Sequence, residues 1–139
     1  MIDAGGDVTT EPRPAPRVVL VDDSATMREA ITELLTSRGC TVVAEAADGR
    51  AALEIAGGGD VIVVDHRLGD THGDEVVAAL VQRHPGVEVI SYSASSDPFI
   101  EHRMLAAGAS RHFYKSDFAA LARHVARHPE RMMRLQAPR

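Results

Sequence analysis

Three aspartates follow two short apolar runs, in positions from which they could meet in one acidic site. Asp22 and Asp23 come directly after Val18–Val21, and Asp65 comes directly after Val61–Val64. Two carboxylates held ~4 Å apart repel by about 4 kcal/mol at an effective dielectric constant of roughly 20. A divalent cation would relieve this repulsion. Mg²⁺ favours a few carboxylates together with water and phosphate, so we expect Mg²⁺ here, with Mn²⁺ as the alternative.

Helix capping is the other interpretation of these acids. It accounts for Asp23, or for Ser24 beside it, because either side chain can accept a hydrogen bond from the first turn of a helix. It does not account for Asp65, which precedes the loop 66–73. We therefore favour an acidic site.

Ser93 and Lys115 follow two later apolar runs, Val87–Tyr92 and His112–Tyr114. Lys115 is the only lysine in a chain that otherwise uses fourteen arginines. Lysine supplies a compact point charge on a flexible stem. Lys115 beside a group of carboxylates is therefore predicted to pair with a bound anion.

These apolar runs are predicted to be strands that carry the polar residues to one edge of a sheet. Runs of this kind that alternate with helical patterns indicate a parallel sheet with crossover helices. We predict a (βα)5 α/β fold, with a doubly wound parallel five-stranded sheet of flavodoxin-like order 2-1-3-4-5. The expected strands are Val18–Val21, Thr41–Glu45, Val61–Val64, Val87–Tyr92 and His112–Tyr114.

The predicted sheet order places the acids together. In such a fold, ligands bind beyond the carboxyl ends of the strands where the order reverses, here between the first and third strands. Asp22, Asp23 and Asp65 all follow those two strands. Helices are expected at 24–38 with Ser24 as N-cap, at 51–56, at 74–83, from Asp97-Pro98 to before Gly108, and after Ser116 as N-cap.

Composition limits the class of protein. The chain has 139 residues, a net charge of −5 and one cysteine, Cys40. This length suits one domain, and no apolar run reaches the ~20 residues of a membrane span. The negative charge argues against nucleic-acid binding by this domain. We expect a cytoplasmic protein without a disulfide or a membrane contact.

Three segments are expected along the chain. Residues 1–16 are rich in proline and glycine and are predicted to be a disordered leader. Residues 17–127 form the domain, and 128–139 form a basic C-terminal tail. The tail is either a solvated helix face with a frayed end or a docking segment. The seven histidines lack the spacing of a metal motif and are expected to be exposed.

The chain resembles the receiver domains of two-component response regulators over residues 17–127. The motifs that carry the resemblance are Val18–Ser24, Val61–Asp65 with Gly73 eight residues on, Ser93-Ala94, Gly108-Ala109 and Lys115. The resemblance implies that Asp65 is the phosphoacceptor. It also implies that Asp22, Asp23, Asp65 and the backbone carbonyl of Arg67 bind the metal.

The resemblance assigns further roles. Ser93 would hydrogen-bond the phosphoryl group, and Lys115 would pair with it. His112 falls at the position of a switch aromatic, where it either packs or makes the switch sensitive to pH. Arg67 and Ser95 would flank the path of attacking water and tune the lifetime of the phosphoryl group.

Four positions depart from the commonest pattern of the family. Ser93 replaces threonine, and His112 replaces tyrosine or phenylalanine. Gly69 and Ser116 stand where proline is common, the latter directly after Lys115.

The function implied is a signalling receiver that is not an enzyme beyond its own phosphotransfer and autodephosphorylation. The donor would be a sensor histidine kinase or a phosphotransfer protein, and the recipient a downstream protein or an output domain of the same protein. A homodimer through the fourth helix, fifth strand and fifth helix, or through the first helix, is a further expectation.

Two rival functions fit the sequence less well. A hydrolase with an aspartyl-phosphate intermediate needs a second aspartate two residues after its nucleophile, where this chain has Arg67. The second rival is a degenerate receiver domain that serves only as a docking module. Such a module would not need the complete set of three aspartates together with Ser93 and Lys115.

Overall fold

Five parallel strands form the centre of the structure, a computed structural model that describes residues 15–69 and 71–136. Their order β3-β2-β4-β7-β8 is 2-1-3-4-5 along the chain, which confirms the predicted fold. Residues 1–14 of the predicted leader lie outside the described residues, whereas Pro16 is buried and its carbonyl accepts from the Thr41 amide. The strands are β2 (Arg17–Val21), β3 (Thr41–Ala46), β4 (Val61–Asp65), β7 (Glu88–Ser93) and β8 (Arg111–Tyr114).

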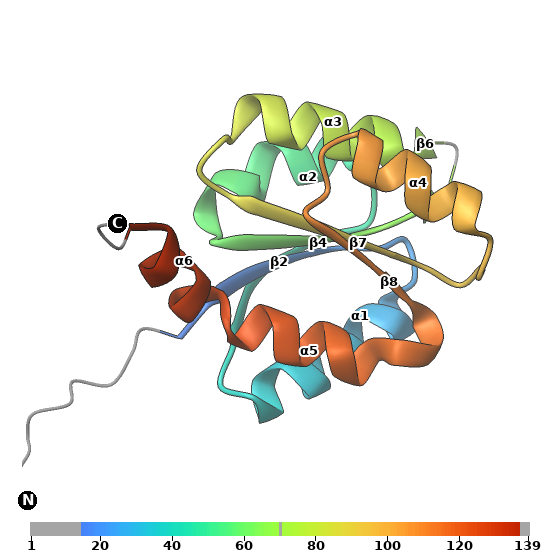
Figure 1. Ribbon diagram of the computed structural model, residues 1–139. Coiled ribbons are helices and arrows are strands. Elements are labelled where there is room, and N and C mark those ends of the chain that lie inside the picture. Colours follow the sequence, from blue (N-terminus) through green and yellow to red (C-terminus); the bar gives the residue numbers. More distant parts are fainter. Residues whose placement is uncertain (1–14, 70, 137–139) are drawn as a thin grey trace, which may run out of the picture.

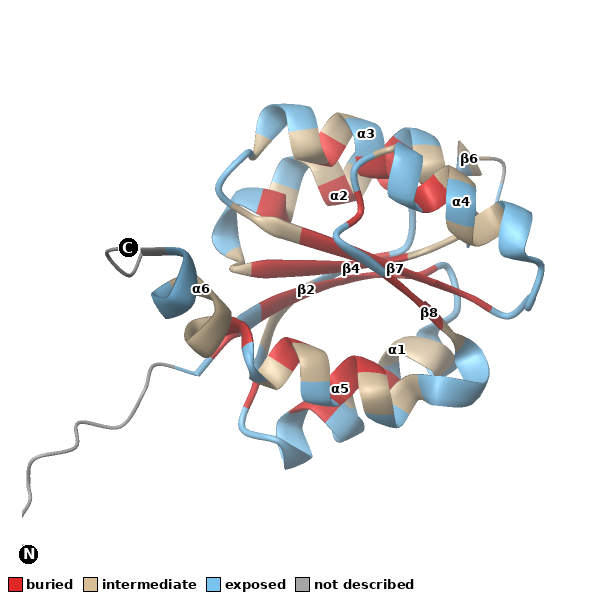
Figure 2. Cartoon of the chain, in the orientation of Figure 1, coloured by how far each residue is buried: buried red, intermediate tan, exposed pale blue. Residues whose placement is uncertain are grey.

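Helices cover both faces of the sheet (Figure 1). Helices α1 (Ala25–Ser37) and α5 (Phe118–Ala126) lie on one face, and α2 (Gly49–Ile55), α3 (Gly73–Arg83) and α4 (Pro98–Ala106) lie on the other. Between these layers, the three central strands β2, β4 and β7 are buried along most of their length (Figure 2). The doubly wound arrangement therefore leaves the strand ends as the places where polar side chains can gather.

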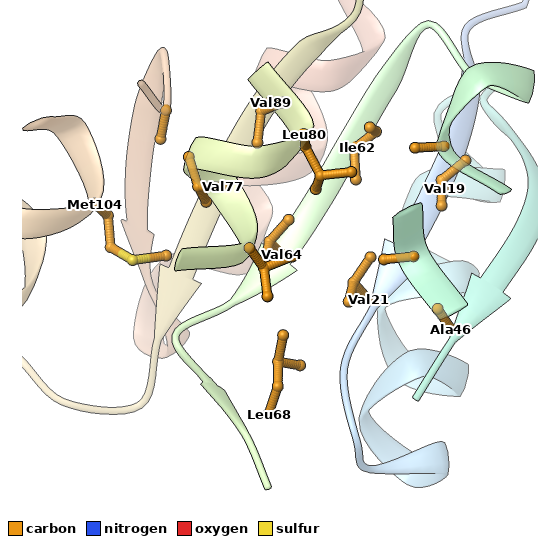
Figure 3. Packing of buried hydrophobic residues seen from close by; sticks show 14 residues of the cluster. Val19, Val21, Ala46, Ile62, Val64, Leu68, Val77, Leu80, Val89 and Met104 are labelled. Atoms are coloured by element: carbon orange, nitrogen blue, oxygen red, sulfur yellow. The ribbon is translucent and has the colours of Figure 1, made fainter. Parts of the chain in front are cut away.

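Side chains of the strands alternate between two apolar clusters, because successive residues of a strand point to opposite faces. Val19, Val21, Ile62 and Val64 pack with Val77, Leu80 and Met104 on the side of α2, α3 and α4 (Figure 3). Val18, Leu20, Val61 and Val63 pack on the side of α1 and α5. Residues just beyond a strand end follow the same alternation, which therefore determines the face of the sheet to which each of them points.

The helix boundaries agree with the sequence at two caps and differ at two others. Ser24 accepts from the Met27 amide and Asp97 from the Phe99 amide, as predicted. Helix α2 begins earlier than expected because Asp48 caps it. The prediction of Ser116 as N-cap is wrong, since a 3₁₀ turn, η2 (Lys115–Asp117), includes Ser116 and moves the start of α5 to Phe118.

Three short elements were not predicted. A 3₁₀ turn, η1 (Ala56–Gly58), follows α2, and strands β5 (Arg67–Leu68) and β6 (Thr71–His72) pair as a hairpin in the loop after β4. Gly69 has φ +63° in that hairpin. Proline, whose φ is held near −65°, cannot adopt this conformation, which explains why glycine replaces it here.

Helix α6 (His128–Gln136) lies within the predicted basic tail. Pro129 falls in its first turn, where proline costs no hydrogen bond. The Arg131 guanidinium and His124 both bind the Glu88 carboxylate, so α6 is joined to the start of β7. Within the described residues, no helix has both the length and the apolar character to span a membrane.

The expectation that the histidines are exposed is wrong for three of them. His112 and His128 are buried, and the His124 side chain is only 12% exposed. Hydrogen-bonding partners that are distant in sequence, such as Ser91 for His112 and Glu88 for His124, make this burial tolerable.

Candidate functional site

Asp22, Asp23 and Asp65 form one acidic cluster at the carboxyl ends of β2 and β4. One carboxylate oxygen from each residue lies within 4.8 Å of the others, which confirms that the three carboxylates meet. Val21 of β2 pairs with Val64 of β4, so Asp22 and Asp65, the residues that follow them, lie side by side. Asp22 is buried, Asp65 is partly buried and Asp23 is exposed.

Alternation along the strands explains which way two of these acids face. Asp22 continues the row of Val18 and Leu20, and Asp65 continues the row of Val61 and Val63. Both rows face α1 and α5. The two carboxylates therefore lie on the same side of the sheet, above the end of the apolar cluster.

A cavity of about 220 Å³ opens onto the cluster. The three aspartates line it together with Lys115 and Tyr92 and with Ala94, Ser24 and Met27. Lys115 thus lies in the same cavity as the acids, where the sequence predicted it. Several carboxylate oxygens beside room for water are the ligands that Mg²⁺ and Mn²⁺ prefer, so the residues present fit a hard divalent cation.

The charge of Asp65 depends on its neighbours. Burial raises its pKa, and the charges of Asp22 and Asp23 raise it further, whereas backbone hydrogen bonds from Arg67 and His66 lower it. The net effect raises the pKa of Asp65 to about 7. A cation among the three carboxylates would favour the ionised form.

Two hydrogen bonds hold the carboxylate of Asp22. The Ser24 amide donates to Oδ1 at 2.8 Å, and the Tyr92 hydroxyl donates to Oδ2. Burial raises the pKa of Tyr92, and the hydrogen bond to Asp22 adds to this, so the phenol keeps its proton. Sequence reasoning missed Tyr92, treating it only as the end of an apolar run, although alternation along β7 places it on the same face as Asp22.

Ser93 lies at the end of β7 but points away from the cavity, on the α4 side. Its hydroxyl donates to the Ser95 carbonyl at 2.6 Å and lies 3.2 Å from His112 Nε2. The other ring nitrogen, Nδ1, lies 2.7 Å from the Ser91 hydroxyl. Ser91, Ser93 and His112 are all buried.

The hydrogen bonds of this network determine the protonation of the ring. Ser93 has one hydroxyl proton and gives it to Ser95, so His112 Nε2 must donate to Ser93. Nδ1 is then an acceptor, and Ser91 donates to it. Burial lowers the pKa of His112, which favours the same neutral ring.

The two predicted tuning residues lie near the cavity without lining it. Arg67 is exposed and borders a neighbouring pocket with Phe99 and Arg103 of α4. Its amide lies 3.4 Å from Asp65 Oδ1. The Ser95 hydroxyl accepts from the Asp97 amide, just before α4.

Comparison with known proteins identifies the family of this chain. The chain matches the response regulator receiver domain family over residues 18–126. It is 37% identical over 97 residues to the transcriptional regulatory protein NarL of Mycobacterium tuberculosis, covering 68% of this chain and 45% of NarL. It is 28% identical over 95 residues to the chemotaxis protein CheY of Thermotoga maritima, covering 67% of this chain and 79% of CheY. The chain spans about half the length of NarL and of the response regulator GacA of Pseudomonas viridiflava.

Solved structures agree with the sequence match. The signal receiver domain of NarL from Mycobacterium tuberculosis superposes with a TM-score of 0.72 at 32% identity, covering 81% of this chain and 97% of that one. A LuxR-family two-component response regulator from Aurantimonas sp. SI85-9A1 superposes with a TM-score of 0.77 at 28% identity, covering 84% and 86%. The chain therefore belongs to the receiver domains of two-component response regulators.

Proposed function

We propose that this receiver domain accepts a phosphoryl group on Asp65 from a phosphohistidine of a sensor histidine kinase or phosphotransfer protein. The observation that carries the proposal is the meeting of Asp22, Asp23, Asp65 and Lys115 in one cavity at the strand ends. A partly buried carboxylate beside two further acids and one lysine suits the transfer of a dianionic group.

The transfer is an in-line displacement at phosphorus. A carboxylate oxygen of Asp65 forms the new O–P bond while the N–P bond to the donor histidine breaks, and the imidazole nitrogen keeps the electron pair and takes up a proton. The Lys115 ammonium attracts the transferred oxygens. Asp22, Asp23, Asp65 and the Arg67 carbonyl would hold Mg²⁺, which when bound neutralises charge on the phosphoryl oxygens.

Loss of the phosphoryl group uses the same cavity. Water attacks the phosphorus, the O–P bond to Asp65 breaks, and inorganic phosphate leaves. Arg67 and Ser95 stand beside the cavity and remain our candidates for setting the rate of this step. The receiver domain would catalyse these reactions only on itself.

The readout begins at Ser93. Its hydroxyl would leave the Ser95 carbonyl and His112 and turn to a phosphoryl oxygen, which changes the packing between β8 and α4. This change would reach the surface formed by α4, β8 and α5. That surface, or α1, is our candidate for contact with a downstream protein, an output domain or a second copy.

The name of one relative supports a proposal about the output that this domain controls. NarL is named as a transcriptional regulator, and this chain matches less than half of it. We propose that the domain works in the cytoplasm and controls such an output, without itself contacting nucleic acid or membrane.

Phosphorylation by a small donor tests the proposal. The full chain is incubated with acetyl phosphate or phosphoramidate, with Mg²⁺ or with a chelator, and its intact mass is measured. We expect one added phosphoryl group that requires Mg²⁺ and is lost in Asp65→Asn. No mass gain under any of these conditions would favour the degenerate docking module instead.

A further inference from the structure

Tyr92 connects the acidic cluster to the apolar packing under it. The residue is only 2% exposed, it borders the cavity, and its hydroxyl donates to Asp22 Oδ2. Its ring packs edge-on against Phe118, the first residue of α5, with ring centroids 5.2 Å apart and planes at 87°. Phe118 therefore holds the Tyr92 ring in place while the Tyr92 hydroxyl bonds Asp22.

The hydrogen bonds of Asp22 leave a defined part of its carboxylate free. The Ser24 amide takes one lone-pair site on Oδ1, and Tyr92 takes one on Oδ2. Each carboxylate oxygen has about two such sites, so each oxygen keeps one. Because both oxygens are bonded, the carboxylate cannot rotate without losing a hydrogen bond in a buried place.

We propose that Tyr92 is a positioning residue that holds Asp22 in the orientation in which it binds a divalent cation. The inference rests on the proposed function in taking the acidic cluster as a cation site. Hydrogen-bond partners of metal-ligating groups orient them, and their loss typically lowers metal affinity about 10–100-fold.

The hydroxyl of Tyr92 is not needed to fill space. Phenylalanine would keep the ring and its contact with Phe118, and it would add no polar atom to a buried position. The hydroxyl instead donates into a group of three carboxylates, where a donor lowers the repulsion among them. The Tyr92 hydroxyl therefore has the position expected of a hydrogen-bond partner that orients a metal ligand without binding the metal itself.

Tyr92→Phe tests the inference, with Tyr114→Phe as the matched control. The Tyr114 hydroxyl donates to Glu101 of α4 at 2.7 Å, away from the acids. Mg²⁺ alone is titrated calorimetrically into the full chain and into each variant. We expect Tyr92→Phe to weaken binding about tenfold and Tyr114→Phe to leave it unchanged.

Two outcomes separate this inference from the proposed function. Equal or tighter binding by Tyr92→Phe would overturn the role of Tyr92 and leave the cation site intact. No binding by the unchanged protein would overturn the cation site of the proposed function, and the role of Tyr92 with it.

Tyrosine emission gives a second readout that needs no change at the site. The chain has two tyrosines and no tryptophan, so Tyr92 is the only strong emitter in Tyr114→Phe. A carboxylate that accepts from a phenol quenches its emission, and a cation on Asp22 weakens that acceptor. We expect Mg²⁺ to raise the emission of Tyr114→Phe but not of Tyr92→Phe, and an unchanged Tyr114→Phe signal would contradict the inference.

Discussion

Among the described residues that line the cavity, Lys115 is the only one with a positively charged side chain, since the other charged groups there are aspartates. Its residue type and its place after a strand were enough to predict its position from the sequence. We expect Lys115→Gln to slow phosphorylation by acetyl phosphate at least tenfold, about 1.4 kcal/mol in activation free energy. The rate of mass gain in Mg²⁺ measures it.

The control for Lys115 removes a charge from β8, the strand that precedes it. Arg111 of β8 is exposed and stacks over Phe113 outside the cavity. Arg111→Gln should keep the rate of the unchanged protein. Equal slowing by both variants would mean that overall charge matters, and not the position of Lys115.

His112 should be a neutral ring with its proton on Nε2 at pH 7. Burial lowers its pKa, and the Ser91–His112–Ser93 hydrogen bonds select this tautomer. Long-range ¹⁵N–¹H NMR correlations report the tautomer directly. A proton on Nδ1, or a charged ring at pH 7, would contradict the network.

Ser91→Ala provides the matched comparison for His112. It removes the donor to Nδ1 and leaves Ser93 in place, so we expect the preference for the Nε2–H tautomer to weaken. The exposed His102 of α4 provides a reference ring outside the network in the same spectra.

The junction between β4 and α3 depends on Gly73. Its amide donates to the His66 carbonyl at 2.7 Å, and a Cβ added there would lie 2.8 Å from His66 Cα and closer still to the Asp65 carbonyl. We expect Gly73→Ala to lower the free energy of unfolding by about 2 kcal/mol and to slow phosphorylation, because the backbone at Asp65 must shift. Urea denaturation and mass gain measure the two effects.

Gly86 is the control for Gly73. No atom lies within 4 Å of a Cβ added there. Gly86→Ala should change the free energy of unfolding by no more than about 0.5 kcal/mol. A Gly73→Ala variant as stable as Gly86→Ala would show that the close approach does not constrain the loop.

Strand patterns predicted more of the site than loop patterns did. Apolar runs followed by Asp22 and Asp65 were visible in the sequence, and the sheet order brought them together. The direction of Ser93 was not visible, because it depends on Ser95 and His112, which lie in other elements. The hairpin β5–β6 was also missed, since two residues per strand give no alternation to recognise.

The attachment of α6 involves the whole molecule. Burial raises the pKa of Glu88, but hydrogen bonds from His124, Arg131 and Ser110 outweigh burial and lower it to about 2. The Glu88 side chain is only 10% exposed. The sequence indicated a basic tail, either a solvated helix face or a docking segment, but not the distant acid that binds α6.

Glu88→Gln should destabilise the protein in a pH-dependent way. The pKa of Glu88 lies below its ordinary 4.5, so ionised Glu88 stabilises the fold above that pH, and this is lost as pH falls towards 2. We expect a loss of roughly 2–3 kcal/mol in the free energy of unfolding at pH 7 and a smaller one at pH 3. Urea denaturation at both pH values measures it.

An exposed ion pair is the control for Glu88. Glu45 bonds Arg28 at 2.8 Å with its side chain 47% exposed. Glu45→Gln should cost less than about 1 kcal/mol. A Glu88→Gln loss no larger than this, or one that does not shrink at low pH, would mean that the ion network does not hold α6.

In the proposed function, Asp65 itself carries the phosphoryl group. After phosphorylation by acetyl phosphate with Mg²⁺, borohydride reduces an aspartyl phosphate to homoserine, and peptide mass mapping locates the product. We predict homoserine at position 65 and unreduced aspartate at Asp22 and Asp23. Homoserine at either of those two positions, or at none of the three in phosphorylated protein, would contradict the assignment of Asp65 as the phosphoacceptor.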